Sequence, residues 1–302
     1  MQIYELPPGQ FARVEGLFAA AWFDQAVIGA GLEGRQPVRV FVDDPDRPSA
    51  AMLCHPYDYY LAGGVSPALR QFIADAPAEA GVFAQLYGYC PIGADWERAL
   101  LTDSGERLVV IPRRNFKYWH EAPPAPGQSA RQAALRQAEV QPIDAGLARQ
   151  IDRRFRRAIS RNWGDPAAFL QGAFGFCVTV GQEIAAIALP AAVSRRYADL
   201  DVETAPAFRR QGLAYAVCAR FIGECLDKGL TVCWDTDGSN LASAALAEKL
   251  GFSEEAPFSE LGSGQRSPPP LSSSRWTGRQ SGDGIWEWAA KDQPGRDQAM
   301  GG

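Results

Sequence analysis

The feature that most constrains this 302-residue sequence is an alternating strand pattern that runs into a helix through a basic, glycine-containing turn. The stretch YADLDVETAP (197–206) alternates as a half-buried strand does, and QGLAYAVCARFIGECLDKG (211–229) is helical and ends at a glycine. A helix needs no positive charge at its first turn, yet Arg209, Arg210 and Gly212 stand there. Either the first turn of this helix is basic by chance, with Gly212 a minor defect, or the junction binds a ligand.

The junction has the properties of an anion site. A helix N-terminus exposes unpaired backbone N–H groups and the positive end of the helix dipole. Gly212 lets a ligand approach the backbone closely, and Arg209 and Arg210 add positive charge. The spacing matches neither the Walker A loop nor the Rossmann glycine pattern. The sequence thus predicts a phosphate-binding turn of another kind.

The elements around this turn predict an α/β fold. Residues 174–190 (FGFCVTVGQEIAAIALP) predict a hairpin, and LTVCWD (230–235) predicts a buried strand before a helix at 239–251. Residues 143–164 predict one helix, whose arginines form either a solvated face, the commoner case, or a binding patch. The order hairpin, strand, helix, strand, helix implies a mixed sheet of the α+β kind with helices on its faces.

Composition suggests where the domains lie. Residues 37–44 and 49–55 predict two strands, and residues 66–77 predict a helix with Ser66 as its cap. The stretch EAPPAPGQSARQ (121–132) is rich in proline and glycine and has no apolar period. We expect a division into a first domain, a linker, a coenzyme-binding domain and a Gly/Ser/Pro-rich disordered tail, at 1–120, 121–136, 137–261 and 262–302 respectively.

Two motifs together resemble the GNAT superfamily of acyl-CoA-dependent N-acetyltransferases. Its pattern [QR]-x-x-G-x-[GA] is matched by Arg209, Gly212 and Ala214, and Asn240 then precedes a helix that ends in KLGF (249–252). Within the superfamily, the sequence looks like a bacterial branch that includes self-resistance acetyltransferases for amine-bearing antibiotics such as zwittermicin. The resemblance covers residues 174–252, and for the first half it implies a degenerate GNAT-like domain without a coenzyme loop.

The resemblance implies one site for acetyl-CoA as cosubstrate. In the family, two neighbouring strands splay apart, and the pantetheine arm lies between them against the backbone of the strand before the turn. Asn240 has two open roles, as a contact of the coenzyme or as an ordinary helix cap. The implied coenzyme-binding residues are Val202, Thr204, Arg209, Arg210, Gln211, Gly212, Leu213, Ala214, Tyr215, Asn240 and Ser243.

The strand before the turn carries the candidate general bases. Asp199, Asp201 and Glu203 alternate with apolar residues and so share one face, which borders either a wet cavity or solvent at a sheet edge. Glu203 is the first choice of base for the attacking amine, and Asp201 the second. Asp235 either binds the substrate amine or caps the next turn.

The family's usual proton donor is missing. Many relatives place a tyrosine in the last helix to protonate the leaving thiolate, and that position is Ala247 here. The proton must then come from water, from Ser243 or another residue, or from the ammonium formed at the attacking amine.

Composition excludes several other classes of protein. The net charge of −5, without a Lys/Arg-rich run, argues against a nucleic-acid partner. The six cysteines are scattered as free thiols are in a reducing compartment, and the two histidines lack metal-ligand spacing, so we expect no metal. The N-terminus does not read as a signal peptide, and no apolar run reaches the ~18 residues of a membrane span, so we expect no membrane partner and a cytoplasmic location.

The predicted function is N-acetylation of a primary amine on a small molecule, by direct attack within a ternary complex. The alternative is an acetyl-CoA-binding sensor or scaffold without turnover. For the acceptor pocket we expect a contribution from the first half, where HPYDYYLAGG offers Tyr57, Asp58, Tyr59 and Tyr60 in one loop-like run.

Overall fold

The chain forms two compact units that interleave along the sequence. The N-terminal unit comprises Met1–Ala20, Val38–Val110 and Ser259–Gly302, and the C-terminal unit comprises Ala21–Pro37 and Ile111–Phe258. The chain thus passes between the units inside strand β6 (Leu108–Tyr118), not at the expected linker, of which residues 125–136 lie outside the described part. The computed structural model describes residues 2–55, 58–75, 87–91, 94–104, 108–124, 138–156, 158–263, 276–280 and 286–290.

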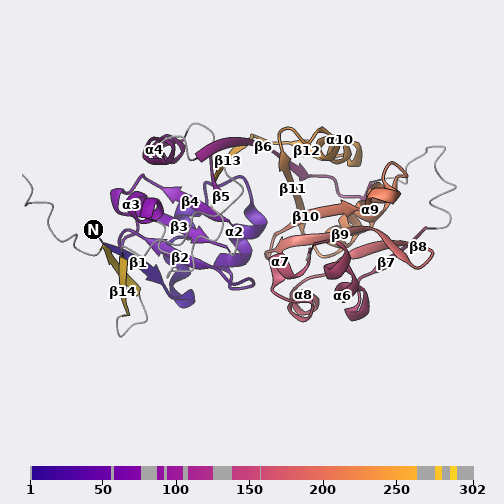
Figure 1. Ribbon diagram of the computed structural model, residues 1–302, viewed down its shortest axis with the longest axis horizontal. Coiled ribbons are helices and arrows are strands. Elements are labelled where there is room, and N and C mark those ends of the chain that lie inside the picture. The colour runs from indigo at the N-terminus through magenta and orange to yellow at the C-terminus, as the bar shows by residue number, and fades with distance from the viewer. Residues whose placement is uncertain are drawn as a thin grey trace, which may run out of the picture. The chain divides into compact units, whose positions relative to one another are not determined.

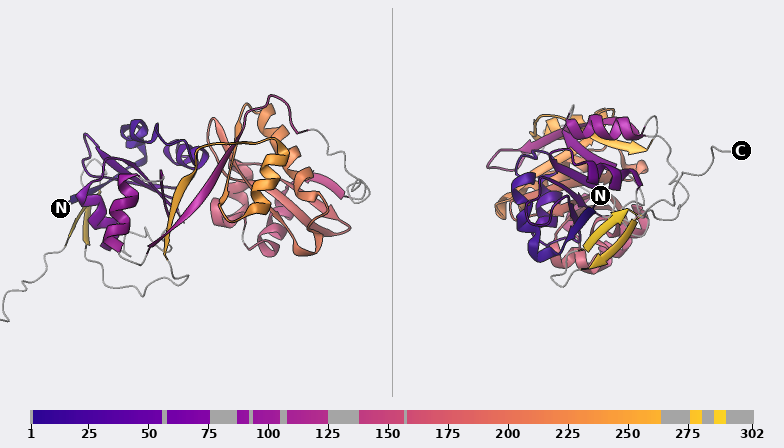
Figure 2. Two further views of the ribbon diagram at one scale, coloured as in Figure 1. Left: turned by 90° about the horizontal axis from the view of Figure 1, so that it is seen from above. Right: turned by 90° about the vertical axis from the view of Figure 1, so that its left-hand side faces the viewer.

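The N-terminal unit is a mixed sheet against which helices pack (Figure 1). Strands β1 to β4 pair antiparallel in chain order, β4 pairs parallel to β5, and β13 follows β5. Helices α3 and α4 pack beside each other (Figure 2). Its elements are β1 (Gln2–Leu6), a 3₁₀ helix η1 (Pro8–Arg13), α1 (Glu15–Phe18), β2 (Arg39–Val42), β3 (Ala50–Cys54), β4 (Tyr59–Gly63), α3 (Pro67–Asp75), β5 (Tyr87–Pro91), α4 (Asp95–Ser104) and β13 (Phe258–Ser263).

Two further strands of this unit correct the expected tail. Strands β14 (Trp276–Gln280) and β15 (Trp286–Ala290) form a hairpin, and β15 pairs antiparallel with β1. The expectation of a disordered tail is therefore wrong for these ten residues. The physical reason is that β1 has an edge open to pairing, a non-local partner that Gly/Ser/Pro composition does not reveal.

The core of the N-terminal unit lies between its sheet and its helices. Ile3, Phe41, Met52 and Phe72 are 0% exposed, and Tyr59 and Tyr60 of β4 are 2% exposed. Tyr59 belongs to this core, and Tyr60, the next residue of β4, is equally closed off from solvent. This corrects the expectation that the two tyrosines line an acceptor pocket, while Tyr57 lies outside the described residues. The strand pattern of β4 was hidden in the sequence because two polar-tipped aromatics stand side by side.

The C-terminal unit repeats this architecture. Strands β7 to β10 pair antiparallel in chain order, β10 pairs parallel to β11, and β6 pairs antiparallel to β11. Its elements are α2 (Gln25–Leu32), β6, β7 (Ala138–Pro142), α6 (Ala145–Arg154), α7 (Ser160–Trp163), α8 (Pro166–Gly172), β8 (Phe176–Val180), β9 (Glu183–Val193), β10 (Tyr197–Thr204), a 3₁₀ helix η4 (Pro206–Phe208), α9 (Leu213–Asp227), β11 (Thr231–Asp237), α10 (Leu241–Leu250) and β12 (Ser253–Glu254), which pairs with β6.

Each unit contains a strand that enters it from a segment of the other unit. β6 follows α4 of the N-terminal unit, yet its residues from Ile111 onward belong to the C-terminal unit. In the reverse direction, β13 follows the C-terminal unit's α10 and β12 but belongs to the N-terminal unit from Ser259 onward. The segment Ala21–Pro37, with α2, also joins the C-terminal unit, where α2 packs against β9 and β10.

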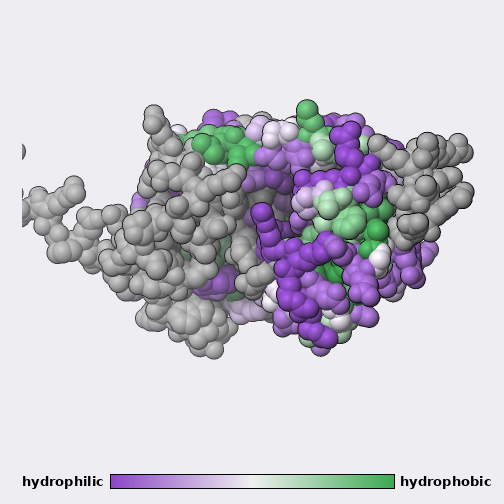
Figure 3. Space-filling view, turned by 45° about the vertical axis from the view of Figure 1, so that its right-hand side comes forward, coloured by the Kyte–Doolittle hydropathy of each residue, from purple (hydrophilic) through white to green (hydrophobic). Residues whose placement is uncertain are grey.

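Most local predictions for the C-terminal unit are confirmed, with one exception. The predicted hairpin is β8 and β9, and the strand before the basic turn is β10. The single helix predicted for 143–164 is divided into α6 and α7, because Arg156 has a left-handed φ of 47°. Arg153 and Arg154 are exposed, on a unit whose visible face is largely hydrophilic (Figure 3). Among the described residues, no helix has the length and apolarity needed to cross a membrane.

Candidate active site

Strands β10 and β11 pair at one end and then part. β10 pairs with β9 through Thr204, but its parallel pairing with β11 covers only Tyr197 to Asp199 and ends opposite Cys233. The backbone of β10 from Leu200 onward therefore has a hydrogen-bonding edge that β11 does not use. An edge of this kind can pair with an extended ligand.

The turn after β10 leads into a helix end without a side-chain cap. Gly212 is the N-cap residue of α9, with φ 84° and ψ 3°, and no side chain caps the helix there. A Cβ on Gly212 would meet no atom within 4 Å, so the space beside it is open. The first N–H groups of α9 have no partner inside the helix. Gly212 thus faces open space at the positive end of the α9 dipole.

Side chains of the turn hold its backbone. Arg209 Nε donates to the carbonyl of Thr204 at 3.3 Å, and Gln211 Nε2 donates to the carbonyl of Ala207 at 3.4 Å. Arg210 is exposed and has a φ of 65°, a left-handed conformation that costs a non-glycine residue roughly 1 kcal/mol. The turn therefore keeps a strained shape while two guanidinium groups stay at the surface.

Helix α10 begins beside β11 with a side-chain cap. Asn240 Oδ1 accepts from the backbone N–H of Ser243 at 3.2 Å, which confirms the helix-cap role for Asn240; a coenzyme contact stays a prediction. Ser243 Oγ accepts from the indole Nε1 of Trp234 at 3.0 Å. Ala247, one turn further along the helix, is 0% exposed.

The acidic face of β10 carries an ion pair. Arg161 of α7 lies 3.2 Å from Asp201 Oδ2, and the two side chains are 51% and 36% exposed. On β11, Asp235 accepts from Arg113 Nε of β6 at 2.7 Å, and this pair is more buried. Glu203 is exposed at the end of β10 nearest the turn. The face therefore borders solvent and holds alternating charges.

Electrostatics raise the pKa of both candidate bases. Burial is the main cause for Asp201, with Asp235 raising its pKa further and Arg161 lowering it. For Glu203, partial desolvation by neighbouring atoms is the first cause of the raised pKa and repulsion from Asp201 the second, while Arg156, Arg161 and Arg209 oppose them. A carboxylate with a raised pKa is a stronger base, which suits it to accept a proton from an amine.

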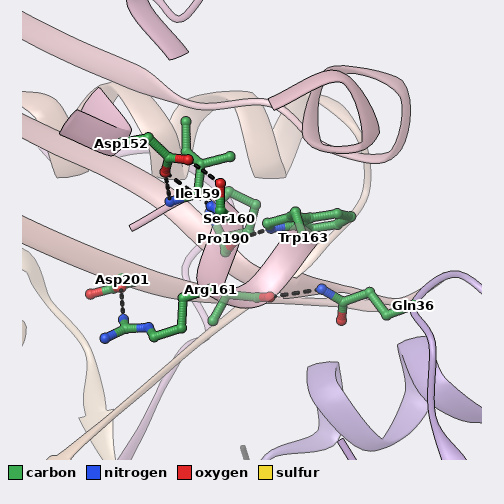
Figure 4. A network of polar contacts seen from close by, with 9 residues as sticks. Gln36, Asp152, Ile159, Ser160, Arg161, Trp163, Pro190 and Asp201 are labelled. Carbon is green, nitrogen blue, oxygen red and sulfur yellow. Dashed lines mark hydrogen bonds and ion pairs between the residues drawn. The ribbon is translucent and has the colours of Figure 1, made fainter. Parts of the chain in front are cut away.

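A polar network positions Arg161 (Figure 4). Asp152 accepts from the backbone N–H groups of Ile159 and Ser160 at 2.9 and 3.0 Å, which fixes the start of α7. Trp163 Nε1 donates to the carbonyl of Pro190 at 2.8 Å and so anchors α7 on β9. With both ends of α7 held in this way, the side chain of Arg161 is directed toward Asp201.

Gln36 ties the segment Ala21–Pro37 to the same network. Its Nε2 donates to the carbonyls of Asn162 and Ala191, at 3.2 and 2.9 Å, and its side chain is buried (Figure 4). Sequence reasoning missed Gln36 because it stands in a different part of the chain from α7. A residue early in the sequence thus helps to shape the acidic side of the C-terminal unit.

Comparison with known proteins assigns the family. A family model described as GNAT acetyltransferase matches residues 16–261. The chain belongs to this family. A curated relative, the uncharacterised N-acetyltransferase YdfB of Bacillus subtilis (strain 168), is 37% identical over 90 residues, which are 30% of this chain and 34% of that protein. The match thus spans about a third of the relative's length.

Solved structures agree with a GNAT fold. A GCN5-related N-acetyltransferase-like protein from Streptococcus suis superposes with a TM-score of 0.66 at 22% identity, covering 84% of this chain and 98% of that one. A tandem GNAT protein from the clavulanic acid biosynthesis pathway gives a TM-score of 0.57 at 11% identity, covering 86% and 98%. At these identities the likeness concerns the fold, which in the second case is a tandem one.

The GNAT fold brings the two predicted motifs to one sheet. The turn with Arg209, Arg210 and Gln211 follows β10, and the start of α10 adjoins the neighbouring β11. Val202 and Thr204 lie on the part of β10 that has left β11, and Leu213, Ala214 and Tyr215 form the first turn of α9. Arg161 had no signal in the sequence, since α7 was read as the end of a longer helix.

Proposed function

We propose that this GNAT chain transfers an acetyl group from acetyl-CoA to a primary amine of a small molecule. The observation that carries the proposal is that β10 stops pairing with β11 after Asp199 and then leads, through its free edge, to an uncapped helix start at Gly212. A ligand with an extended amide-containing arm and a phosphate group would use both features, and acetyl-CoA has both.

The phosphate end fits the turn. The α9 N-terminus offers backbone N–H groups and a favourable dipole, and Arg209 and Arg210 lie next to it. The open space at Gly212 admits an anion to within contact of the backbone. The arm would then run along the edge of β10 at Val202 to Thr204, as an added strand does.

The acidic face fits an amine acceptor. Glu203 would take a proton from the attacking ammonium, directly or through water, with Asp201 as the second candidate. The amine nitrogen then attacks the thioester carbon, and the C–S bond breaks to give the amide and CoA. Backbone N–H groups on the unpaired edge of β10 can stabilise the oxyanion.

Direct attack is favoured over an acetylated enzyme. Cys233, at the end of the β10–β11 pairing, and Cys218 of α9 are buried and free. Burial raises the pKa of both thiols well above the ordinary value, so their nucleophilic thiolates are scarce near neutral pH. We therefore place amine and acetyl-CoA together in a ternary complex.

Two measurements test the proposal. Acetyl-CoA should raise the melting temperature of the full chain, and a panel of small amines should include acceptors that release CoA, detected with a thiol reagent. Stabilisation without CoA release from any amine would favour the alternative of a sensor or scaffold. Ala247 supports that alternative, because it stands where many relatives have the tyrosine that protonates the thiolate. Absence of stabilisation would contradict the proposed site itself.

A further inference from the structure

The hydroxyl of Ser243 has a fixed oxygen and a hydrogen without an acceptor. Its Oγ accepts from Trp234 Nε1 at 3.0 Å, and an indole nitrogen can only donate. The hydrogen of Ser243 must therefore point away from the indole. Within the described part of the chain, no group accepts a hydrogen bond from Ser243 Oγ.

Trp234 fixes the location of this hydroxyl. Trp234 follows Cys233, the last residue of β11 that pairs with β10. Its side chain is 2% exposed, and its ring packs edge-on to Phe252 with centroids 5.5 Å apart. A buried indole has little freedom, so Ser243 is held at the level where β10 and β11 begin to part.

Ser243 is also the one hydroxyl on the inner face of α10. The inner face consists of residues at helical spacing, namely Ser243, Ala244, Ala247 and Leu250, and all except Ser243 are apolar. Ser243 is half-buried, whereas Ala247 is 0% exposed and its methyl group offers no proton. Among these inner-face residues, Ser243 alone can donate a hydrogen bond from its side chain to a ligand between the strands.

We propose that Ser243 donates a hydrogen bond to the sulfur of CoA as the thioester breaks, with Trp234 fixing its orientation. This rests on the acetyl-CoA site proposed above. When the amine nitrogen bonds to the carbonyl carbon, its proton passes to the base, and the electron pair of the C–S bond leaves with sulfur. Serine is a far weaker acid than a thiol, so Ser243 keeps its proton and stabilises the thiolate, which later takes a proton from solvent.

The thiol of bound CoA provides a direct test that needs no acceptor. A hydrogen bond to the charged form of a group favours that form and lowers its pKa. The ultraviolet absorbance of the thiolate is followed against pH for the full chain with CoA, and CoA lacking the thiol serves as the blank for protein tyrosines. Ser243→Ala should raise the pKa of the bound thiol by about one unit, a tenfold change in its dissociation constant.

Three variants separate this role from a structural one. Ser243→Thr keeps a hydroxyl and should restore the wild-type thiol pKa. Trp234→Phe keeps an aromatic ring but removes the indole N–H, and should give part of the shift. Ser239→Ala makes the same chemical change in an exposed serine just before α10, whose Oγ bonds to Asp237, and should leave the thiol pKa unchanged.

The outcomes distinguish the two proposals. If CoA binds and the thiol pKa is the same in wild type, Ser243→Ala and Trp234→Phe, the role of Ser243 is refuted while the coenzyme site stands. If CoA does not bind to the wild-type chain in calorimetry, the coenzyme site fails and the role of Ser243 with it. Should Ser243→Ala not fold, an unchanged thiol pKa in Trp234→Phe decides against the proposal.

Discussion

The two units share a strand order but differ where a strand leads into a helix. In each, four antiparallel strands are followed by a parallel one, β4 with β5 and β10 with β11. In the N-terminal unit, residues 64–66 connect β4 to α3, and Ser66 Oγ caps the helix by accepting from Leu69 N–H. In the C-terminal unit, residues 205–212 form the connection, and no side chain caps α9.

A glycine at the end of β4 and a glycine at the start of α9 show what the difference means. Gly63 and Gly212 both have positive φ, 77° and 84°. A Cβ on Gly63 would lie 2.2 Å from the carbonyl oxygen of Ser49, whereas a Cβ on Gly212 would meet nothing within 4 Å. The first glycine lets the protein close on itself, and the second leaves room for a ligand. The comparison predicts one coenzyme site, in the C-terminal unit.

The largest expected effect is on coenzyme affinity at Gly212. Gly212→Glu places a negative charge where a phosphate would bind, and like charges in contact cost several kcal/mol. The Kd for acetyl-CoA in calorimetry should rise by at least about a hundredfold. Without ligand, the chain should lose only the left-handed backbone cost of roughly 1–2 kcal/mol and stay folded, because the added side chain enters open space.

Alanine at the two glycines provides the matched control. Both substitutions carry the left-handed backbone cost of roughly 1–2 kcal/mol. Gly63→Ala adds the clash with Ser49, and overpacking typically costs about 1–3 kcal/mol more, so it should lower stability further than Gly212→Ala. Weakened acetyl-CoA binding in a folded Gly63→Ala chain would mean that the N-terminal connection also takes part in the site.

The second largest effect is on the reaction rate and follows from a difference between strands β4 and β10. β4 presents Tyr60, Leu61 and Ala62, all buried, whereas β10 presents Asp201 and Glu203. If Glu203 is the base, Glu203→Gln keeps the shape but accepts no proton, and the rate should fall by ~10²- to 10⁴-fold with acetyl-CoA affinity unchanged. A loss below about threefold, with the pH profile intact, would remove Glu203 from the reaction.

The third effect is a pH dependence of stability that arises from a histidine of the N-terminal unit. His55 of the N-terminal unit is 6% exposed, and burial lowers its pKa from 6.5 to about 4. Between these two pH values the unfolded state binds a proton at His55 that the folded state does not bind. The free energy of unfolding therefore decreases as the pH falls from 6.5 towards 4. The loss is about 3 kcal/mol by linkage.

Urea unfolding at several pH values measures this effect. His55→Leu removes the titrating group and should flatten the acid side of the stability profile. Equal pH dependence in the wild type and in His55→Leu would mean that His55 gains a proton without cost.

The smallest effect is a shift of the activity profile. Repulsion from Asp201 is one cause of the raised pKa of Glu203. Asp201→Asn removes that charge and frees Arg161, and both changes should lower the pKa of Glu203. The acidic limb of the pH–rate profile should therefore move to lower pH. A limb that disappears instead would identify Asp201 as the base.

The local part of the site was predictable from the sequence. Alternation in β10, the glycine at the start of α9 and the asparagine at the start of α10 are short-range signals, and the structure has each element in its expected place. Such signals depend on residues a few positions apart, so a single sequence contains them. The break at Arg156 was missed because the apolar period continues through it.

The non-local part was not predictable. The sequences of β6 and β13 predict strands, but they do not determine which of the two units each strand joins. That choice depends on packing between segments that are distant in the sequence. The pairing of β15 with β1 and the bonds of Gln36 to α7 likewise join residues far apart in the sequence. The Gly/Ser/Pro-rich composition of 262–302 predicts disorder, but it contains no information about β1, whose edge pairs with β15.

Calorimetric titration of the full chain with acetyl-CoA tests the contrast between the two units most directly, because it counts sites. One site per chain is predicted, lost in Gly212→Glu and retained in Gly63→Ala if that chain folds. Two sites, or one site that survives Gly212→Glu with unchanged affinity, would contradict the assignment of the coenzyme to the turn between β10 and α9.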